Sequence, residues 1–266
     1  MQDLKKKYGE WALITGASSG IGEQFALKLA EKGMNVILAA RRANRLKDIS
    51  DRIRKQYQVD TLAIPVDISQ DDFLSIIIGA AGNRDIGMLI NNAGFGSTGE
   101  FIDNDSAHEA EMIKVNCIAP TILTHHFVPL MKEKGKGALI FLGSVAGFQA
   151  TPMMTTYSAT KVFNRFLGNG LWYELKKYGI DVLSLNPGGT TTEFQRIADV
   201  DTGPFSRTPE QVVDTALKAL GKKMEVIDGV PNKIVSFISK LSPMQSVVRV
   251  AGKSAMKMYN DYRDKK

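Results

Sequence analysis

Short apolar runs alternate with longer amphipathic stretches along most of the chain, and this alternation restricts the fold more than any other feature. The short runs are apolar almost throughout, which is typical of strands buried on both faces of a parallel sheet. Strands that alternate with helices indicate a doubly wound α/β fold. The predicted strands cover residues 11–14, 36–39, 61–66, 88–90, 138–142 and 182–185. The predicted helices cover residues 21–32, 43–57, 71–81, 105–132 and 155–178.

The length and composition are sufficient for one domain with a large buried core. The chain has 266 residues, 44% of them hydrophobic, and no repeat, low-complexity tract or linker divides it. We therefore expect a single domain over residues 1–266, with helices on both faces of a parallel sheet. Residues 188–208 form a long irregular stretch that we interpret as a substrate lid, with a disordered insertion as the alternative. Residues 231–266 are expected to form a C-terminal helical extension.

A glycine-rich turn follows the first predicted strand and opens the first predicted helix. The sequence T-G-A-S-S-G-I-G begins at Thr15, and its spacing differs from the commoner G-x-G-x-x-G pattern. Glycines permit a sharp turn that brings backbone N–H groups close to a phosphate, and the helix N-terminus adds partial positive charge. A plain helix start is the alternative explanation. The turn predicts a dinucleotide site that includes Gly16, Ser18, Ser19, Gly20, Ile21 and Gly22.

Two arginines end the second predicted strand. The sequence A-A-R-R places Arg41 and Arg42 directly before a helix, where the helix dipole opposes a cation and some compensation is expected. In dinucleotide-binding folds an acidic residue here holds the ribose 2′-hydroxyl, whereas an arginine accommodates a 2′-phosphate. We therefore expect NADP(H) as the cofactor, with Arg41 as the main contact and Arg42 in support. Two solvated arginines are the alternative.

Tyr157 and Lys161 are candidates for proton transfer. They lie four residues apart in Y-S-A-T-K and would share one face of a helix. An isolated tyrosine has a pKa of about 10. A neighbouring ammonium group favours the phenolate, so we expect Lys161 to lower the Tyr157 pKa toward neutrality. Ser144 follows the preceding strand and could donate a hydrogen bond to the same carbonyl oxygen. Surface packing is the alternative for an isolated Y-x-x-x-K pattern.

Taken together, these motifs resemble those of the short-chain dehydrogenase/reductase family. The resemblance covers residues 9–192 and implies a doubly wound, Rossmann-type fold. It implies that Tyr157 is the catalytic acid/base, that Lys161 binds the nicotinamide ribose and tunes Tyr157, and that Ser144 polarises the carbonyl. Asn116, in V-N-C, matches the asparagine that holds a water in the proton relay. An asparagine that only bonds helix backbone is the alternative.

The resemblance also implies further contacts to the dinucleotide. Asp67, in P-V-D, matches a residue that contacts adenine. Thr190 stands where the family usually has a branched apolar residue, but its backbone can still meet the carboxamide. The remaining matches are Asn91, Ala93 and Gly94 in N-N-A-G, at the adenine ribose and central sheet, and Pro187, Gly188 and Thr192 in N-P-G-G-T-T-T, at the nicotinamide end.

The resemblance implies hydride transfer from a reduced nicotinamide to a carbonyl carbon. We expect an NADPH-dependent reductase that converts a hydrophobic ketone or a 3-oxoacyl substrate into a secondary alcohol. A hydroxysteroid or secondary-alcohol dehydrogenase is the enzyme alternative. A non-catalytic dinucleotide-binding regulator is the other alternative, although a regulator does not need the complete proton relay. Apolar residues expected to line the substrate site are Phe95, Phe148, Met153, Met154, Phe194 and Phe205.

Charge and cysteine content limit the partners and the compartment. The 34 basic residues exceed the 28 acidic ones by too little, and too diffusely, to predict nucleic-acid binding. Cys117 is the one cysteine, so no internal disulfide is possible and a reducing, cytoplasmic compartment is expected. No window is apolar enough for a membrane span. No metal site is expected, because the histidines show no ligand spacing: His108, His125 and His126.

The outer helices provide candidate contacts with other molecules. The resemblance implies a homodimer or homotetramer through the fourth and fifth helices, where Phe163, Phe166 and Trp172 are apolar. Near the C-terminus, apolar and basic residues recur at helical spacing. We expect this helix to pack on its own domain or on another subunit rather than on an anionic membrane. The apolar residues are Val247, Val248, Ala251, Ala255, Met258 and Tyr262, and the basic ones are Arg249, Lys253 and Lys257.

Overall fold

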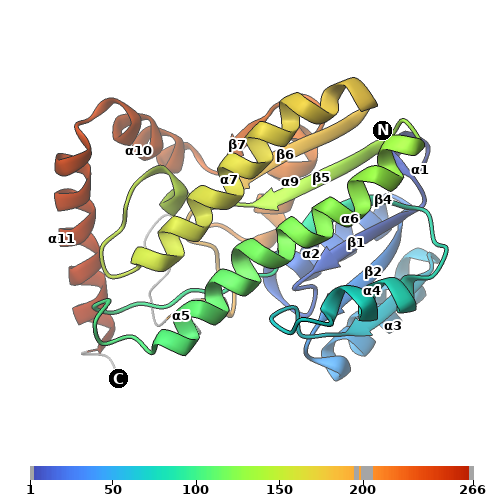
Figure 1. Ribbon diagram of the computed structural model, residues 1–266, viewed down its shortest axis with the longest axis horizontal. Helices are drawn as coiled ribbons and strands as arrows, with labels where there is room; N and C mark the ends of the chain where they lie inside the picture. Colours follow the sequence, from blue (N-terminus) through green and yellow to red (C-terminus); the bar gives the residue numbers. More distant parts are fainter. Residues whose placement is uncertain (1–2, 195–197, 199–205, 264–266) are drawn as a thin grey trace.

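Seven parallel strands form one sheet in the order β3-β2-β1-β4-β5-β6-β7 in the computed structural model, which describes residues 3–194, 198 and 206–263 (Figure 1). The predicted doubly wound fold is therefore confirmed. Six strands correspond to predicted apolar runs, and the seventh, β7, was not predicted. The strands β1 to β7 are Trp11–Thr15, Asn35–Ala40, Thr61–Pro65, Ile86–Asn91, Gly137–Leu142, Ile180–Asn186 and Glu225–Ile227.

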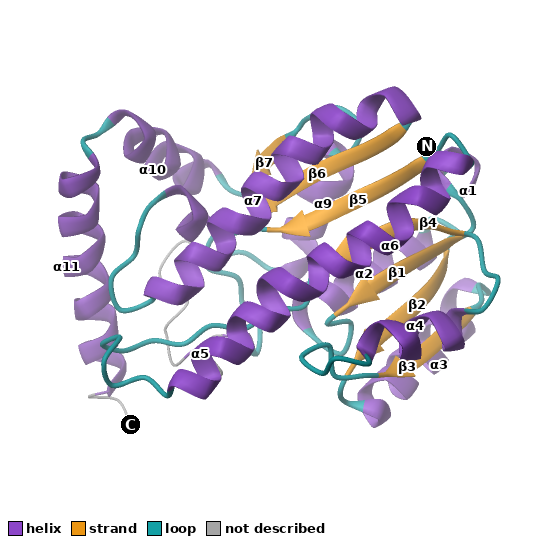
Figure 2. Ribbon diagram, viewed as in Figure 1, coloured by secondary structure: helices purple, strands orange, loops and turns teal. Residues whose placement is uncertain are grey.

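Helices cover both faces of this sheet (Figure 2). The helices α2, α3 and α9 contribute to one hydrophobic cluster, and α4, α6 and α7 contribute to the other. The helix bounds are Leu4–Tyr8 (α1), Gly20–Glu31 (α2), Ala43–Tyr57 (α3), Phe73–Ala81 (α4), Ser106–Ile113 (α5), Ala119–Glu133 (α6), Thr155–Leu175 (α7), Pro209–Ala219 (α9), Val230–Leu241 (α10) and Met244–Arg263 (α11).

The central strand β1 explains why the apolar runs do not alternate with polar residues. Ala12 and Ile14 belong to the cluster under α2, whereas Leu13 belongs to the cluster under α6. All three side chains are fully buried. Successive side chains of a strand point to opposite faces, so a strand covered on both sides needs apolar residues throughout. Burial of each large aliphatic side chain contributes about 1.5–3 kcal/mol.

The helix predicted over residues 105–132 is interrupted by a π-helical turn, Lys114–Ile118, between α5 and α6. Within this turn the Ala119 N–H donates to the Lys114 carbonyl, five residues back. Pro120 has no N–H, so the Asn116 carbonyl loses the donor that an α-helix would provide. The uninterrupted helix prediction was therefore wrong at this point. Periodicity cannot detect one inserted residue within a long amphipathic segment.

The C-terminal helices α10 and α11 lie to one side of the sheet, beyond the carboxyl ends of its strands (Figure 1). Val247 and Ala251 of α11 are buried, and Gly252 lies against Pro152 of the same chain. The expectation that this helix packs on its own domain is thus correct for these residues. The side chains of Met258 and Tyr262 lie outside the described residues. Among the residues that the structure describes, no helix is long and apolar enough to cross a bilayer.

The stretch predicted to be a substrate lid is described only in part. Its two ends pair, because the Thr191 N–H donates to the Arg207 carbonyl and the Arg207 N–H donates to the Gly189 carbonyl, at 3.0 and 2.9 Å. Residues 195–197 and 199–205 lie outside the described residues, and they include Phe205, which was predicted to line the substrate site. The lid stays a prediction.

Candidate active site

A cavity of about 720 Å³ lies at the carboxyl ends of the strands. The loops after strands β1 to β6 line it, on both sides of the point where the chain turns from β1–β3 to β4–β7. Ligands of open α/β sheets bind at such a switch point, because neighbouring loops diverge there. The fold thus brings the sequence motifs together although they are far apart in the chain.

Most of the predicted site residues line this cavity. The three that do not are Gly22, Asn91 and Asn116. Gly22 packs against Gly16, and Asn116 bonds Phe95, and both of these partners line the cavity. Asn91 donates from Nδ2 to Thr124 Oγ1 at 3.1 Å, which joins β4 to α6. The predicted residues in the lining are Gly16, Ser18, Ser19, Gly20, Ile21, Arg41, Arg42, Asp67, Ala93, Gly94, Ser144, Tyr157, Lys161, Pro187, Gly188, Thr190 and Thr192.

The glycine turn after β1 is packed too closely for larger residues. Gly16 has φ +67°, and a Cβ there would lie 2.8 Å from the Ala93 Cα atom. A Cβ on Gly22 would collide with the Gly16 carbonyl oxygen. Ser19, the N-cap of α2, makes no side-chain hydrogen bond to the first turn. The end of this helix is therefore available to an anion, and the turn fits the phosphates of a dinucleotide.

The two arginines after β2 have different surroundings. Arg42 donates from Nη2 to Ser19 Oγ at 2.8 Å and to Ser18 Oγ at 3.0 Å. Its Nη1 lies 2.7 Å from a carboxylate oxygen of Glu193. The side chain of Arg41 is 66% exposed and lies 3.9 Å from Asp67. Arg42 is therefore the arginine that is fixed against the glycine turn.

Glu193 was not identified from the sequence, although some compensation for the two arginines was expected. The guanidinium of Arg42 holds the pKa of Glu193 below its ordinary value. Asn92 was also missed, and it donates from Nδ2 to the Thr15 carbonyl at 2.8 Å. No local pattern identifies Glu193, because it acts on a segment distant in sequence. Asn92 lies within the N-N-A-G motif, which could have indicated it.

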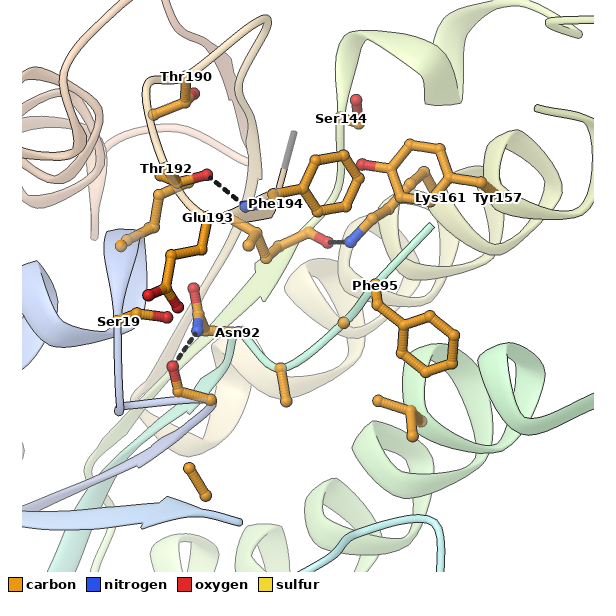
Figure 3. A pocket seen from close by; sticks show the side chains of 18 of the residues that line it. Ser19, Asn92, Phe95, Ser144, Tyr157, Lys161, Thr190, Thr192, Glu193 and Phe194 are labelled. Atoms are coloured by element: carbon orange, nitrogen blue, oxygen red, sulfur yellow. Dashed lines mark hydrogen bonds between the residues drawn. The ribbon is translucent and has the colours of Figure 1, made fainter. Parts of the chain in front are cut away.

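Ser144, Tyr157 and Lys161 lie together at the other end of the cavity (Figure 3). Tyr157 and Lys161 share one face of α7 as predicted, with Lys161 Nζ 5.5 Å from the centre of the Tyr157 ring. The ammonium group donates to the Leu142 carbonyl at 2.9 Å. Ser144, the residue before a short 3₁₀ turn, accepts from the Ala146 N–H at 3.1 Å. Strand β5 and helix α7 thus hold the three groups from opposite sides.

Burial dominates the proton affinities of this group. It raises the pKa of Tyr157 to about 12, and a hydrogen bond with Ser144 opposes the rise. It lowers the pKa of Lys161 to about 8. The expectation that Lys161 lowers the Tyr157 pKa is therefore wrong for the protein alone. Loss of hydration disfavours the phenolate more than the surrounding groups favour it.

Asn116 lies in the π-helical turn and is fully buried. Its Nδ2 donates to the Phe95 carbonyl and to Thr160 Oγ1, both at 3.0 Å. Its carbonyl accepts from Asn164 Nδ2 at 2.8 Å, which replaces the donor that Pro120 lacks. The side chain of Asn116 thus joins the loop after β4 to α7, at the residue directly before Lys161.

Part of the predicted substrate lining is present in the cavity. Phe95, Met154 and Phe194 line it, and the Phe194 ring lies 5.3 Å from the Tyr157 ring. Phe148 is not in the lining, because its ring stacks on the Arg165 guanidinium at 3.8 Å. Met153 is buried outside the cavity lining and was wrongly included.

These residues provide two kinds of chemistry in one cavity. The glycine turn and Arg42 fit a phosphate-bearing group, while Ser144 and Tyr157 offer hydroxyl groups to one oxygen atom. Lys161 adds an ammonium group beside Tyr157. A dinucleotide in the cavity would extend from the turn to the tyrosine, and a carbonyl compound would complete a hydride-transfer site.

Comparison with known proteins leads to the same family. The family model for short chain dehydrogenase matches residues 10–201. The chain is 32% identical over 237 residues to 7beta-hydroxysteroid dehydrogenase of Mediterraneibacter gnavus, with 86% of this chain and 90% of that protein covered. It is 32% identical over 242 residues to the very-long-chain 3-oxoacyl-CoA reductase of Rattus norvegicus, with 89% and 77% covered.

A solved structure extends the likeness to three dimensions. The short-chain dehydrogenase from Sphingobium yanoikuyae in complex with NADPH superposes with a TM-score of 0.78 at 32% identity, covering 90% of this chain and 96% of that one. Sequence, sheet topology and the arrangement around Tyr157 therefore agree that this chain is an oxidoreductase of the short-chain dehydrogenase/reductase family.

Proposed function

We propose that the protein is an NADPH-dependent reductase that converts the carbonyl of a hydrophobic ketone or a 3-oxoacyl substrate into a secondary alcohol. The observation that carries this proposal is the buried group of Ser144, Tyr157 and Lys161, which shares a cavity with the glycine turn. A protein that only senses a dinucleotide would not need hydroxyl groups directed at a second ligand.

In the proposed mechanism, the reduced nicotinamide supplies the hydride that adds to the carbonyl carbon. Tyr157 donates its phenolic proton to the carbonyl oxygen, and Ser144 donates a hydrogen bond to the same atom. A pKa of about 12 keeps Tyr157 protonated at neutral pH, which suits the reductive direction. The Lys161 ammonium stabilises the phenolate that remains, and a water held near Asn116 returns the proton.

The preference for NADP(H) is supported by the residues that follow β2. Arg41 and Arg42 both line the cavity, and neither position carries the acidic residue that would hold a ribose 2′-hydroxyl. The contacts of Arg42 with Ser18 and Ser19 favour Arg42 as the main partner of the 2′-phosphate. A relative of similar fold is an NADPH complex.

The substrate class is supported by the apolar lining and by the relatives. Phe95, Met154 and Phe194 surround the space before Tyr157. The rat relative acts on a 3-oxoacyl-CoA by name, and the bacterial relative is a hydroxysteroid dehydrogenase by name. The second candidate function is therefore a hydroxysteroid dehydrogenase. We also propose a cytoplasmic location, for which the single cysteine remains the argument.

We further propose a homodimer or homotetramer that forms through α5, α6 and α7. This assembly is supported by apolar side chains exposed on these helices, including Ile113, Ile122 and Phe166. An anionic membrane is the competing partner for the C-terminal helices, because α11 carries Arg249 and Lys253 on an exposed face. Flotation with anionic vesicles distinguishes membrane binding from subunit association, since a protein that binds only other subunits stays at the bottom of the gradient.

NADPH oxidation measured against a panel of aliphatic ketones, 3-oxoacyl thioesters and oxosteroids tests the proposed function. We expect turnover with at least one of these classes, and slower turnover when NADH replaces NADPH at the same low concentration. Turnover of an oxosteroid alone would favour the second candidate. Tight NADPH binding with no turnover of any compound would contradict an enzymatic function.

A further inference from the structure

The entrance to the glycine turn holds an intramolecular anion. Glu193 follows β6 at the end of the segment that begins at Pro187, and its carboxylate lies 2.7 Å from Arg42 Nη1. The second carboxylate oxygen lies 3.5 Å from Arg45 Nη2. A hydrogen bond with Ser19 also contributes to its lowered pKa. Figure 3 shows the carboxylate beside Ser19, away from Tyr157 and Lys161.

The groups around this carboxylate are the same ones that would hold a phosphate. Arg42 donates to Ser18 and Ser19, and both serines line the cavity at the start of α2. Glu193 lines the cavity as well. A guanidinium and hydroxyl groups near a helix N-terminus form an anion site, and a carboxylate and a phosphate satisfy it in the same way. They cannot both occupy the same guanidinium edge without repulsion.

We propose that Glu193 is a specificity-determining residue that competes with the 2′-phosphate of NADP(H) for Arg42. The proposal rests on the proposed NADP(H) preference and refines it. The carboxylate occupies the phosphate site in the protein alone and leaves it when the 2′-phosphate binds. NADP(H) affinity is therefore lower than the arginines alone would give, whereas a dinucleotide without the phosphate leaves the Arg42–Glu193 pair intact.

A binding measurement on Glu193→Gln tests this competition without any substrate. Isothermal titration calorimetry gives the Kd for NADP⁺, NAD⁺, 2′,5′-ADP and 5′-AMP. We expect the substitution to tighten NADP⁺ and 2′,5′-ADP binding by about three- to tenfold, the range for a half-exposed ion pair together with relief of repulsion. The Kd values for NAD⁺ and 5′-AMP should change less than about twofold.

A matched control and a second background make the test specific. Glu23→Gln removes a carboxylate that pairs with Arg52 outside the cavity lining and should leave all four Kd values unchanged. In an Arg42→Ala background, Glu193→Gln should no longer tighten NADP⁺ binding. Weaker or unchanged NADP⁺ binding by Glu193→Gln would overturn the proposal, because Glu193 would then position Arg42 or do nothing.

The same Kd values distinguish a failure of the Glu193 competition from a failure of the proposed NADP(H) preference. If the unmodified protein binds NAD⁺ and 5′-AMP as tightly as NADP⁺ and 2′,5′-ADP, the NADP(H) preference fails, and the competition fails with it. If the unmodified protein prefers the 2′-phosphate and Glu193→Gln does not increase that preference, only the competition fails. A thermal melt of each variant confirms that the comparison is made between folded proteins.

Discussion

The two ends of the cavity hold their charges in opposite ways. At the phosphate end, Arg42 and Glu193 pair while 42% and 29% of their side chains remain exposed. At the catalytic end, Tyr157 and Lys161 are buried, and within the described part of the chain no carboxylate pairs with the ammonium group, which donates to the Leu142 carbonyl. Water and salt therefore moderate the first pair, whereas burial changes the proton affinities of the second.

This contrast corresponds to two tasks. A site that selects a phosphate benefits from an exposed, exchangeable ion pair, because the partner has to leave when the ligand arrives. A site that transfers a proton needs groups whose pKa values are fixed by a dry environment. The predictions below test whether selection and chemistry are as separate as the structure indicates.

Replacement of Tyr157 with Phe should have the largest effect. The loss of the phenolic proton donor should lower kcat by about 10²- to 10⁴-fold. The Kd for NADPH should stay within about twofold, because the ring and its packing against Phe194 remain. Steady-state kinetics and fluorescence titration measure the two quantities. Tyr173→Phe, at an exposed position of α7, is the matched control. Equal losses in kcat and in NADPH affinity would show that the catalytic end and the cofactor site are not independent.

Replacement of Lys161 with Met tests the effect of burial on the catalytic end. The Lys161 pKa lies at about 8 in the folded protein, below its ordinary value of 10.5. Between these values the unfolded chain binds more protons, so the stability contributed by this group rises with pH. The stability of the unmodified protein relative to Lys161→Met should therefore increase by on the order of 2 kcal/mol from pH 8 to pH 10.

Urea denaturation of the cofactor-free proteins at several pH values gives this difference. The pKa of the neighbouring Cys117 is raised from 9.0 to about 11, so its titration in the unfolded chain lowers stability within this window. Both proteins carry Cys117, so this contribution cancels in the difference between them. Lys222→Met, at an exposed position, should track the unmodified protein throughout. A stability difference that does not vary with pH would show that Lys161 is not held in a dry site.

Replacement of Arg42 with Ala should weaken NADP⁺ binding by about tenfold, because a guanidinium–phosphate contact is lost. NAD⁺ binding should change little. Arg41→Ala should have a smaller effect, because Arg41 is exposed and makes no contact with the glycine turn that resembles those of Arg42. Titration of each variant with NADP⁺ and NAD⁺ shows which arginine contributes more to NADP⁺ affinity. A larger effect at Arg41 would restore the ranking expected from the sequence. Arg52→Ala is the control for removal of an exposed arginine.

An increase in ionic strength should produce the smallest effect and should act only on the phosphate end of the cavity. Raising the ionic strength from roughly 0.05 M to 0.5 M shortens the screening length and should weaken NADP⁺ binding several-fold. The single-turnover rate at saturating cofactor should change less than about twofold, since Tyr157 and Lys161 are buried. Stopped-flow absorbance of the nicotinamide measures the rate. A salt-dependent single-turnover rate would contradict the dry character of the catalytic end.

The sequence alone determined the elements and their order. Uniformly apolar runs predicted six of the strands, and the spacing of Tyr157 and Lys161 predicted their common helical face. These features are local, because an apolar run indicates a strand buried on both faces, and a spacing of four residues indicates side chains one helical turn apart. Motifs at the carboxyl ends of parallel strands also had to meet at one edge of the sheet, which placed the glycine turn in the same region as Ser144, Tyr157 and Lys161.

Only the tertiary structure decided the electrostatics. Arg42 and Glu193 lie 151 positions apart, and no periodic pattern pairs them. The direction of the Tyr157 pKa shift depends on how completely the fold excludes water, which the presence of Lys161 four residues away did not reveal. The π-helical turn at Asn116 arises where Pro120 removes a donor and Asn164, from another helix, replaces it. Long-range contacts and burial exist only once the chain has folded, so these properties could not be obtained from the local pattern.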